Sequence, residues 1–241
     1  MRRQRAIDES VHQVTEFSSL EDFLMTRQFP TGISTIYDNG LPIDILVIPA
    51  ESDITIFFFH GAIEPDFTVP VLSGLGISGG LKANRVFISD PSLVLDESLL
   101  LGWYAGNKLQ SQLQETLKII IAAVASSLDS DRLIFFGGSG GGFASLYFAH
   151  HFDNSLALVF NPQTDIAKYT QRAIRDYTSK AFNVPAGTPD PLSHLPSSIT
   201  QDLCGLYKEP TTTTVAYMQN ENDTAHVRSH LQPFRMAMHA D

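Results

Sequence analysis

The sequence predicts an α/β fold with a mostly parallel sheet that is covered on both sides. Three observations lead to this prediction. Short apolar runs of strand length alternate with amphipathic helical stretches, a pattern typical of parallel sheets. The run 54–59 is almost continuously apolar, as expected for a strand buried on both faces. Near the start of the chain, Asp38-Asn39-Gly40 lies between two runs rich in β-branched residues and predicts a β-hairpin.

The expected elements follow one another along the chain. A capping box formed by Ser18 and Glu21 predicts a short helix over 20–27. Apolar patterning predicts strands at 33–37, 43–48, 54–59, 85–89, 133–136, 156–160 and 213–218, and helices at 109–127, 142–149, 167–181 and 225–238. The last helix is expected to be kinked or broken at Pro233.

Two regions are set apart from this alternation. Residues 1–30 form a polar segment with the short helix, and residues 31–241 form the α/β domain. Within the domain, residues 163–210 mix helical pieces with Pro185, Pro189, Pro191 and Pro196 and read as an irregular, cap-like insertion. Because ligands gather at the carboxyl ends of parallel strands, we expect this insertion to cover a substrate site.

Composition excludes several classes of function. The 241 residues are 43% hydrophobic and 17% charged, which suits one domain with a large core, and the net charge of −10 argues against a nucleic-acid partner. The lone Cys204 allows neither an intrachain disulfide nor a cysteine-based metal site. Residues 117–125 are too few to span a membrane, and residues 1–10 do not resemble a signal peptide. We therefore expect a cytoplasmic protein without a metal or cofactor.

The run Gly137-Gly138-Ser139-Gly140-Gly141 is the strongest functional signal. It connects an expected buried strand to an expected helix, and so tight a turn forces the serine into strained backbone angles. Glycines on both sides relieve crowding and let a substrate approach the main chain. The G-x-S-x-G pattern predicts a nucleophile elbow with Ser139 as the nucleophile.

Other glycine motifs fit this run poorly. A dinucleotide-binding fingerprint started at Gly138 or Gly140 would need its third glycine where Phe143 or Ser145 stands. A phosphate-binding P-loop needs a Gly-Lys pair, and this stretch has no lysine. A tight turn with an incidental serine remains open as the alternative interpretation.

A serine hydroxyl is a weak nucleophile, so it needs a base, an acid to orient the base, and donors for the oxyanion. The segment Phe59-His60-Gly61-Ala62 follows the buried run 54–59 directly. We expect the backbone N–H groups of Ala62 and Gly140 to form the oxyanion hole, and His60 to brace this loop rather than act as the base.

The hairpin, the buried strand ending in His60-Gly61, and the strand–turn–helix around Ser139 resemble the α/β-hydrolase superfamily from about residue 33 to the end. The resemblance implies a three-layer sandwich and the chain order serine, acid, histidine. It points to Asp223, after the run 213–218, as the acid, with Asp165 as second choice. Asp223 is also a favoured residue for capping the helix that follows, and this alternative stays open.

The histidine departs from the pattern of the superfamily. Its usual place is after one further strand, yet the residues beyond Asp223 read as a helix. The remaining candidates are His226, one turn past Asp223, then His230 and His239. The alternative is that the last strand and its histidine are missing, which would leave this chain inactive.

The resemblance implies a serine-dependent hydrolase, a carboxylester hydrolase or an acyl (acetyl) transferase, that forms an acyl-enzyme on Ser139. Asp223 and His226 would move the proton. Similar sequences occur in bacterial cell-surface polysaccharide contexts, which suggests a small-molecule or glycan acyl ester as substrate. A noncatalytic α/β-hydrolase-like binding or assembly module is the alternative from another class, and a peptidase has no distinguishing feature here. The sequence does not specify an oligomeric state.

Overall fold

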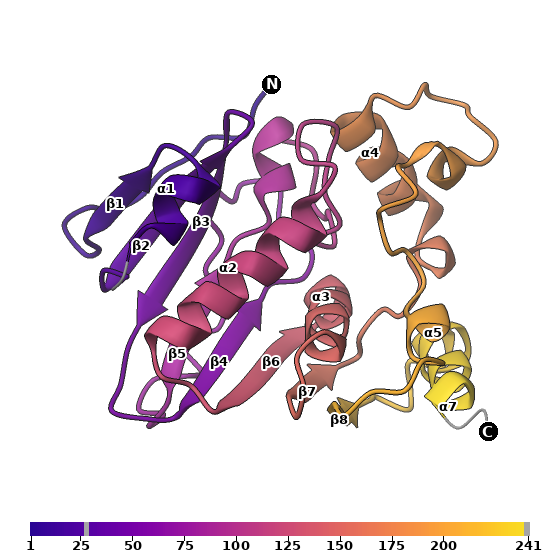
Figure 1. Cartoon of the computed structure of the whole chain (residues 1–241). Helices are drawn as coiled ribbons and strands as arrows, with labels where there is room; N and C mark the ends of the chain where they lie inside the picture. The colour runs from indigo at the N-terminus through magenta and orange to yellow at the C-terminus, as the bar shows by residue number, and fades with distance from the viewer. Residues whose placement is uncertain (27–28, 239–241) are drawn as a thin grey trace.

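The computed structural model describes residues 1–26 and 29–238, and an eight-stranded sheet crosses them in the order β1-β2-β3-β5-β4-β6-β7-β8 (Figure 1). Only β3 is antiparallel to its neighbours, and the other strands share one direction. The strands are β1 (Val14–Phe17), β2 (Gly32–Asp38), β3 (Leu41–Ile48), β4 (Ile54–Phe59), β5 (Asn84–Ile88), β6 (Arg132–Gly138), β7 (Leu156–Phe160) and β8 (Thr214–Met218). The predicted α/β class with a mostly parallel sheet is confirmed.

The predicted hairpin forms between β2 and β3. Asn39 and Gly40 occupy its turn with φ of 49° and 76°, both in the left-handed region. A two-residue turn with positive φ at both positions matches the right-handed twist of the strands that it joins. The Asn-Gly pair therefore sets the register of this end of the sheet.

The N-terminal segment contributes to the sheet, which its polar composition did not predict. Its strand β1 lies parallel to β2 at the edge. The guanidinium of Arg5 lies 2.7 Å from the carboxylate of Asp44, which is buried on β3. Helix α1 (Leu20–Leu24) is capped by Ser19, whose hydroxyl accepts from the backbone N–H of Asp22, so the predicted cap at Ser18 is off by one residue. The helix ends at Leu24, earlier than predicted, and Arg27 itself lies outside the described residues.

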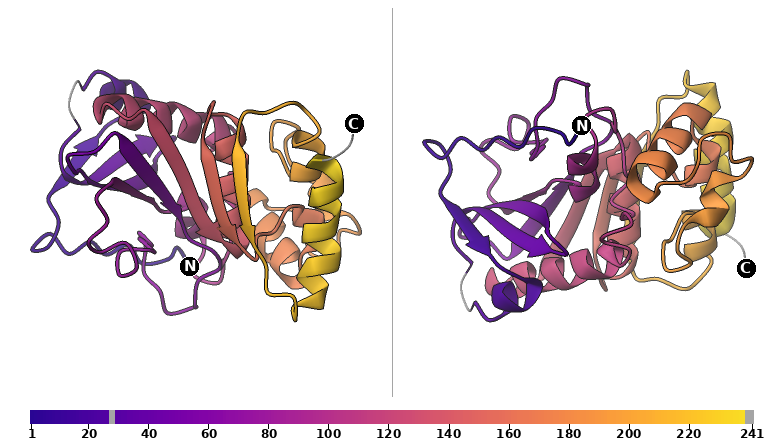
Figure 2. Two further views of the ribbon diagram at one scale, coloured as in Figure 1. Left: turned by 90° about the horizontal axis from the view of Figure 1, so that it is seen from below. Right: turned by 90° about the horizontal axis from the view of Figure 1, so that it is seen from above.

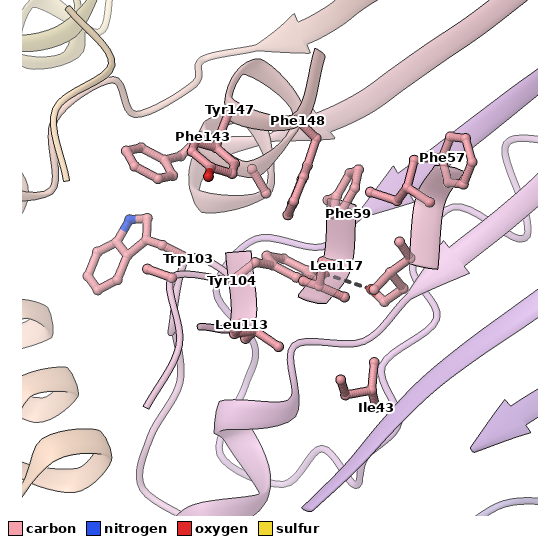
Figure 3. Close-up of a cluster of buried hydrophobic side chains, with 14 of the residues drawn as sticks. Ile43, Phe57, Phe59, Trp103, Tyr104, Leu113, Leu117, Phe143, Tyr147 and Phe148 are labelled. Carbon is pink, nitrogen blue, oxygen red and sulfur yellow. Dashed lines mark hydrogen bonds between the residues drawn. The ribbon is translucent and has the colours of Figure 1, made fainter. Parts of the chain in front are cut away.

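The two faces of the sheet are covered differently. On one face the large core includes buried residues of the main helices, and Figure 3 shows part of it around Phe59, Leu117 and Phe143. On the other face a smaller cluster contains Phe58 and Phe87, packed against irregular segments around Ile7 and residues 72–75. Figure 2 shows long helix α2 along one side of the sheet only. The second face is thus covered by irregular chain.

The helices follow the predicted order with shifted ends. They are α2 (Leu113–Ser127), α3 (Ser139–His150), α4 (Gln171–Phe182), α5 (Leu203–Leu206), α6 (Thr224–His226) and α7 (Gln232–Met238), with short 3₁₀ segments η1 (Pro91–Leu95), η2 (Ile166–Lys168) and η3 (Pro191–His194). The predicted break near Pro233 is a π-helical segment, η4 (Val227–Leu231), directly before α7. Among the described residues, which end at 238, no strand follows β8.

Candidate active site at the end of β6

Ser139 lies at the turn where β6 ends and α3 begins. Its φ is +52°, in the left-handed region, which residues other than glycine seldom adopt. Such backbone strain persists where surrounding contacts fix it, and it is concentrated at functional sites. Parallel neighbours β4 and β7 end beside this turn, so their following loops face Ser139.

The glycines around Ser139 permit contacts that any side chain would block. A Cβ on Gly141 would overlap the carbonyl oxygen of Phe59 at the end of β4. A Cβ on Gly137 would overlap the carbonyl of Gly141, and one on Gly138 would overlap the ring of Phe160. The turn is therefore pressed against both neighbouring strands, and glycine is required for this approach.

The loop after β4 lies directly against Ser139. A Cβ placed on Gly61 would lie 3.1 Å from the carbonyl oxygen of Gly138 and 3.9 Å from the backbone nitrogen of Gly140. Within residues 1–26 and 29–238, the N–H groups of Ala62 and Gly140 have no hydrogen-bond acceptor. Two unpaired donors thus lie on the loops that meet at Ser139.

His60 is fully engaged with its own loop. Its Nδ1 lies 2.8 Å from the carbonyl oxygen of Gly61, and its Nε2 accepts from the backbone N–H of Asp90 at 3.1 Å. Burial lowers the pKa of His60, which favours the neutral ring that this pairing needs. The backbone N–H of His60 also donates to the hydroxyl of Tyr104. With both ring nitrogens occupied, His60 is in a bracing position.

Gln163 is the partner of Ser139 that the sequence did not reveal. Its side-chain Nε2 donates to Ser139 Oγ at 2.9 Å, and its backbone N–H donates to the carbonyl of Ser139 at 3.1 Å. The indole Nε1–H of Trp103 donates to Gln163 Oε1. Because an indole N–H can only donate, it fixes the amide with its NH₂ group toward Ser139. A buried glutamine three residues after the end of β7 has no sequence signature, so only the structure identifies it.

Asp223 and His226 form a pair. Asp223 Oδ2 lies 3.1 Å from His226 Nδ1, and Oδ1 of the same carboxylate accepts from the backbone N–H of His226 at 3.1 Å. The same carboxylate therefore caps α6 and contacts the imidazole of His226. His226 Nε2 is buried and has no hydrogen-bond partner among the residues that the structure describes.

No hydrogen bond joins His226 to Ser139 among the described residues. His230, Thr164 and Gln163 lie between them. The ring of His226 lies 6.3 Å from that of Tyr169 and 5.0 Å from that of His230. His230 Nδ1 accepts from the backbone N–H of Thr164, the residue next to Gln163. His230 is thus committed to the backbone, and burial lowers its pKa to about 4.

Asp165 and His239 are the remaining candidates from the sequence. Asp165 caps η2, where its Oδ1 accepts from the backbone N–H of Ala167 at 2.8 Å, and burial raises the pKa of its carboxyl group. It pairs with no histidine among the described residues. His239 lies outside the described residues.

Two cavities meet at Ala62. One, of about 380 Å³, contains Ser139 and is walled by apolar and small residues, among them Phe136, Phe160 and Ile77. The other, of about 270 Å³, is lined by residues 99–101, by Ala62, and by the start of α4 with Arg172 and Asp176. The loop 60–62 therefore separates an uncharged cavity from one with charged residues at its rim.

The strand order, the sharp turn at Ser139 and the position of the loop 60–62 give this chain an α/β-hydrolase-like fold. A point mutant of the capsule O-acetyltransferase of Neisseria meningitidis serogroup A, in complex with CoA, is similar in structure with a TM-score of 0.60, at 15% identity over 83% of this chain and 82% of that one. Pyrococcus horikoshii acylaminoacyl peptidase has a TM-score of 0.56, at 13% identity over 90% of this chain and 36% of that one.

A third similar structure is Porphyromonas gingivalis dipeptidyl peptidase 4, with a TM-score of 0.54 at 11% identity, over 87% of this chain and 30% of that one. No family model matches the sequence, and no curated protein matches it. At these identities the similarity establishes the fold alone. The two peptidases are far longer than this chain.

Two features are absent from residues 1–26 and 29–238. No helix within the described residues is long and apolar enough to cross a membrane. The same part of the chain holds no group of three or more histidine, cysteine, aspartate or glutamate side chains that could bind a metal ion.

Proposed function

We propose that this protein is a serine-dependent carboxylester hydrolase or acyl transferase, with Ser139 as nucleophile, His226 as general base and Asp223 as the acid that orients it. The observation that carries the proposal is a complementary pair of unpaired groups. His226 Nε2 is a buried acceptor without a donor, and the O–H of Ser139 has no acceptor among the described residues. The close packing of the neighbouring glycines holds Ser139 in its strained turn, and the cap formed by Asp223 holds His226.

The reaction would proceed in two halves. Ser139 Oγ attacks the ester carbonyl carbon while its proton passes to His226 Nε2, and the N–H groups of Ala62 and Gly140 stabilise the oxyanion. The bond to the leaving alcohol then breaks, and the alcohol oxygen takes the proton from His226. Water or an acceptor hydroxyl next attacks the acyl-enzyme by the reverse sequence, which frees Ser139 Oγ with its proton.

Similarity in fold supports this assignment at the level of class. The similar structures include an acetyltransferase and peptidases. The hydrogen bond from Gln163 to Ser139 Oγ does not oppose it, since catalytic hydrogen bonds are often long or poorly aligned without substrate and tighten on binding. The charged rim formed by Arg172 and Asp176 suits a polar acceptor or leaving group, such as a sugar hydroxyl.

The second candidate function is a noncatalytic binding or assembly module. One observation favours it: the partner of Ser139 Oγ in this structure is an amide that cannot accept a proton, and not an imidazole.

Labelling by an alkyl fluorophosphonate distinguishes the two. We expect stoichiometric labelling of the natural protein and none of Ser139→Ala. The matched control is Ser73→Ala, because Ser73 lines the same cavity without backbone strain. If Ser139→Ala labels as well as the natural protein, or if neither labels, Ser139 is not an activated nucleophile and the noncatalytic function stands.

A further inference from the structure

The sheet face that carries Phe58 and Phe87 is exposed to solvent at one end, and this end lies beside Ser139. On that face, rings from four adjacent strands form a row: Phe87 lies 4.6 Å from Phe58, Phe58 lies 5.4 Å from Phe136, and Phe136 lies 5.5 Å from Phe160. Met218 on β8 is the register partner of Phe160 and extends the row. An aromatic row of this kind normally forms the floor of a packed layer.

The irregular segment around Gly74 covers only part of this row of side chains. Phe58 is 4% exposed beneath the segment around Gly74, whereas Phe160 is 44% exposed and Met218 is 49% exposed. Ile77, which ends the covering segment, is 71% exposed. Large apolar side chains are therefore left in contact with solvent at one end of the sheet, at a substantial cost in hydration free energy.

Phe136 and Phe160 of this row line the cavity that contains Ser139, and Met218, the register partner of Phe160, continues the row beyond that lining. Gly138, the residue before Ser139, is the register partner of Phe160, whose ring occupies the space that a side chain at Gly138 would need. We call Phe136, Phe160, Met218 and Ile77 the apolar shelf. No aspartate, glutamate, lysine or arginine lines the cavity above it, whereas the cavity across Ala62 has Arg172 and Asp176.

We propose that the apolar shelf binds the acyl group of the ester that Ser139 attacks, and that this group is a chain longer than acetyl, of roughly six to eight carbons. The shelf crosses from β6 to β8, which is two interstrand spacings or roughly 10 Å. An acetyl methyl would leave most of the cavity of about 380 Å³ and most of the shelf exposed. The charged cavity then receives the alcohol portion. This inference rests on the proposed function of Ser139.

The test is a series of p-nitrophenyl esters from acetate through butyrate and hexanoate to octanoate. We expect kcat/KM to rise by about two- to fourfold per methylene up to hexanoate, because each added methylene leaves water. In Phe160→Ser and Ile77→Ser the dependence of kcat/KM on chain length should become flat, so that the ratio of hexanoate to acetate turnover falls toward one. Ile77 is so exposed that its variant keeps the fold even if Phe160→Ser does not.

Ile119→Ser is the matched control, since Ile119 is an exposed isoleucine on α2, which packs on the other face. It should keep the full chain-length dependence. The shelf assignment would be overturned if the natural protein preferred acetate, or if the shelf variants kept the dependence of kcat/KM on chain length. Turnover that depends on Ser139 would in that case still support the proposed function. Turnover that survives in Ser139→Ala, or no turnover of any ester, defeats both. A monomer produced from a natural dimer by Ile77→Ser would identify a second copy as the occupant and also overturn the proposal.

Discussion

Gln163 donates its side-chain amide to Ser139 Oγ at 2.9 Å, and Trp103 holds that amide in this orientation. Trp103 itself has a φ of +55°, so the strained serine is supported by a second strained residue 36 positions earlier in the chain. The hydrogen bond leaves the hydroxyl proton of Ser139 free to point elsewhere. Gln163 is thus placed to orient the nucleophile and to stabilise negative charge on Oγ.

Replacing Gln163 by leucine should slow fluorophosphonate labelling of Ser139 by about five- to thirtyfold, the effect of losing one hydrogen bond of about 1–2 kcal/mol. Trp103→Phe keeps the ring but removes the N–H that fixes the amide, and should slow labelling less. Circular-dichroism melting of both variants separates this effect from a loss of folded protein. A labelling rate equal to that of the natural protein in folded Gln163→Leu would exclude this role.

The double role of Asp223 can be separated by two substitutions. Asparagine is a good N-cap, so Asp223→Asn should retain stability, but its amide cannot hold the imidazole in the required tautomer, and kcat should fall by about 10²–10⁴-fold. Asp223→Ala should lose activity and also about 1 kcal/mol of stability. Ester turnover and urea unfolding measure the two effects. Full activity in Asp223→Asn would leave capping as the only role of Asp223.

His226→Ala should reduce ester turnover as strongly as Ser139→Ala, because residues of one catalytic unit act together and their losses do not add. The double variant is therefore expected to be no slower than either single variant. His12→Ala is a control for removing a histidine, since His12 lies in the turn before β1. Additive losses in the double variant would contradict a shared role.

His230 should make the fold sensitive to acid. Burial lowers its pKa to about 4, below the usual 6.5 that applies to the unfolded chain, so the unfolded state binds more protons between these values. The free energy of unfolding is therefore unaffected by this group above pH 6.5. It falls by about 2 kcal/mol, after allowance for solvent screening, as the pH drops toward 4. Chemical unfolding of the natural protein and of His230→Asn between pH 7 and 4 measures the difference. Asparagine can still accept from Thr164, so identical pH slopes would contradict the assignment.

The glycines at the turn should be far more sensitive to substitution than glycines elsewhere. Gly141→Ala places a methyl group against the carbonyl oxygen of Phe59, which is backbone and cannot move aside, and should cost about 3 kcal/mol or more. Gly79→Ala, where the nearest atom is 3.6 Å from the new methyl group, should change stability by less than about 0.5 kcal/mol. Urea unfolding compares them, and similar losses would show that the close packing at Ser139 is unimportant for folding.

Most of the sheet was predictable because strand patterning is local. The continuous apolar run of β4 and the Asn39-Gly40 turn contain their own signals. The edge strand β1 was not predicted, because its polar residues pair with β2 on one side only and carry little alternation. Helix α1 begins at Leu20 as predicted, but its cap is Ser19 and not Ser18, because adjacent serines offer equivalent caps.

The sequence by itself determined where the turn of Ser139 falls, because only glycine neighbours permit so close an approach of three strands. It also determined the spacing of Asp223 and His226, which the helix repeat brings onto one face. The tertiary structure alone decided that Gln163 faces Ser139, that His230 bonds to the backbone, and that an aromatic row ends uncovered beside the site. Those relationships join residues on different strands and loops, and long-range packing leaves no periodic trace in the chain.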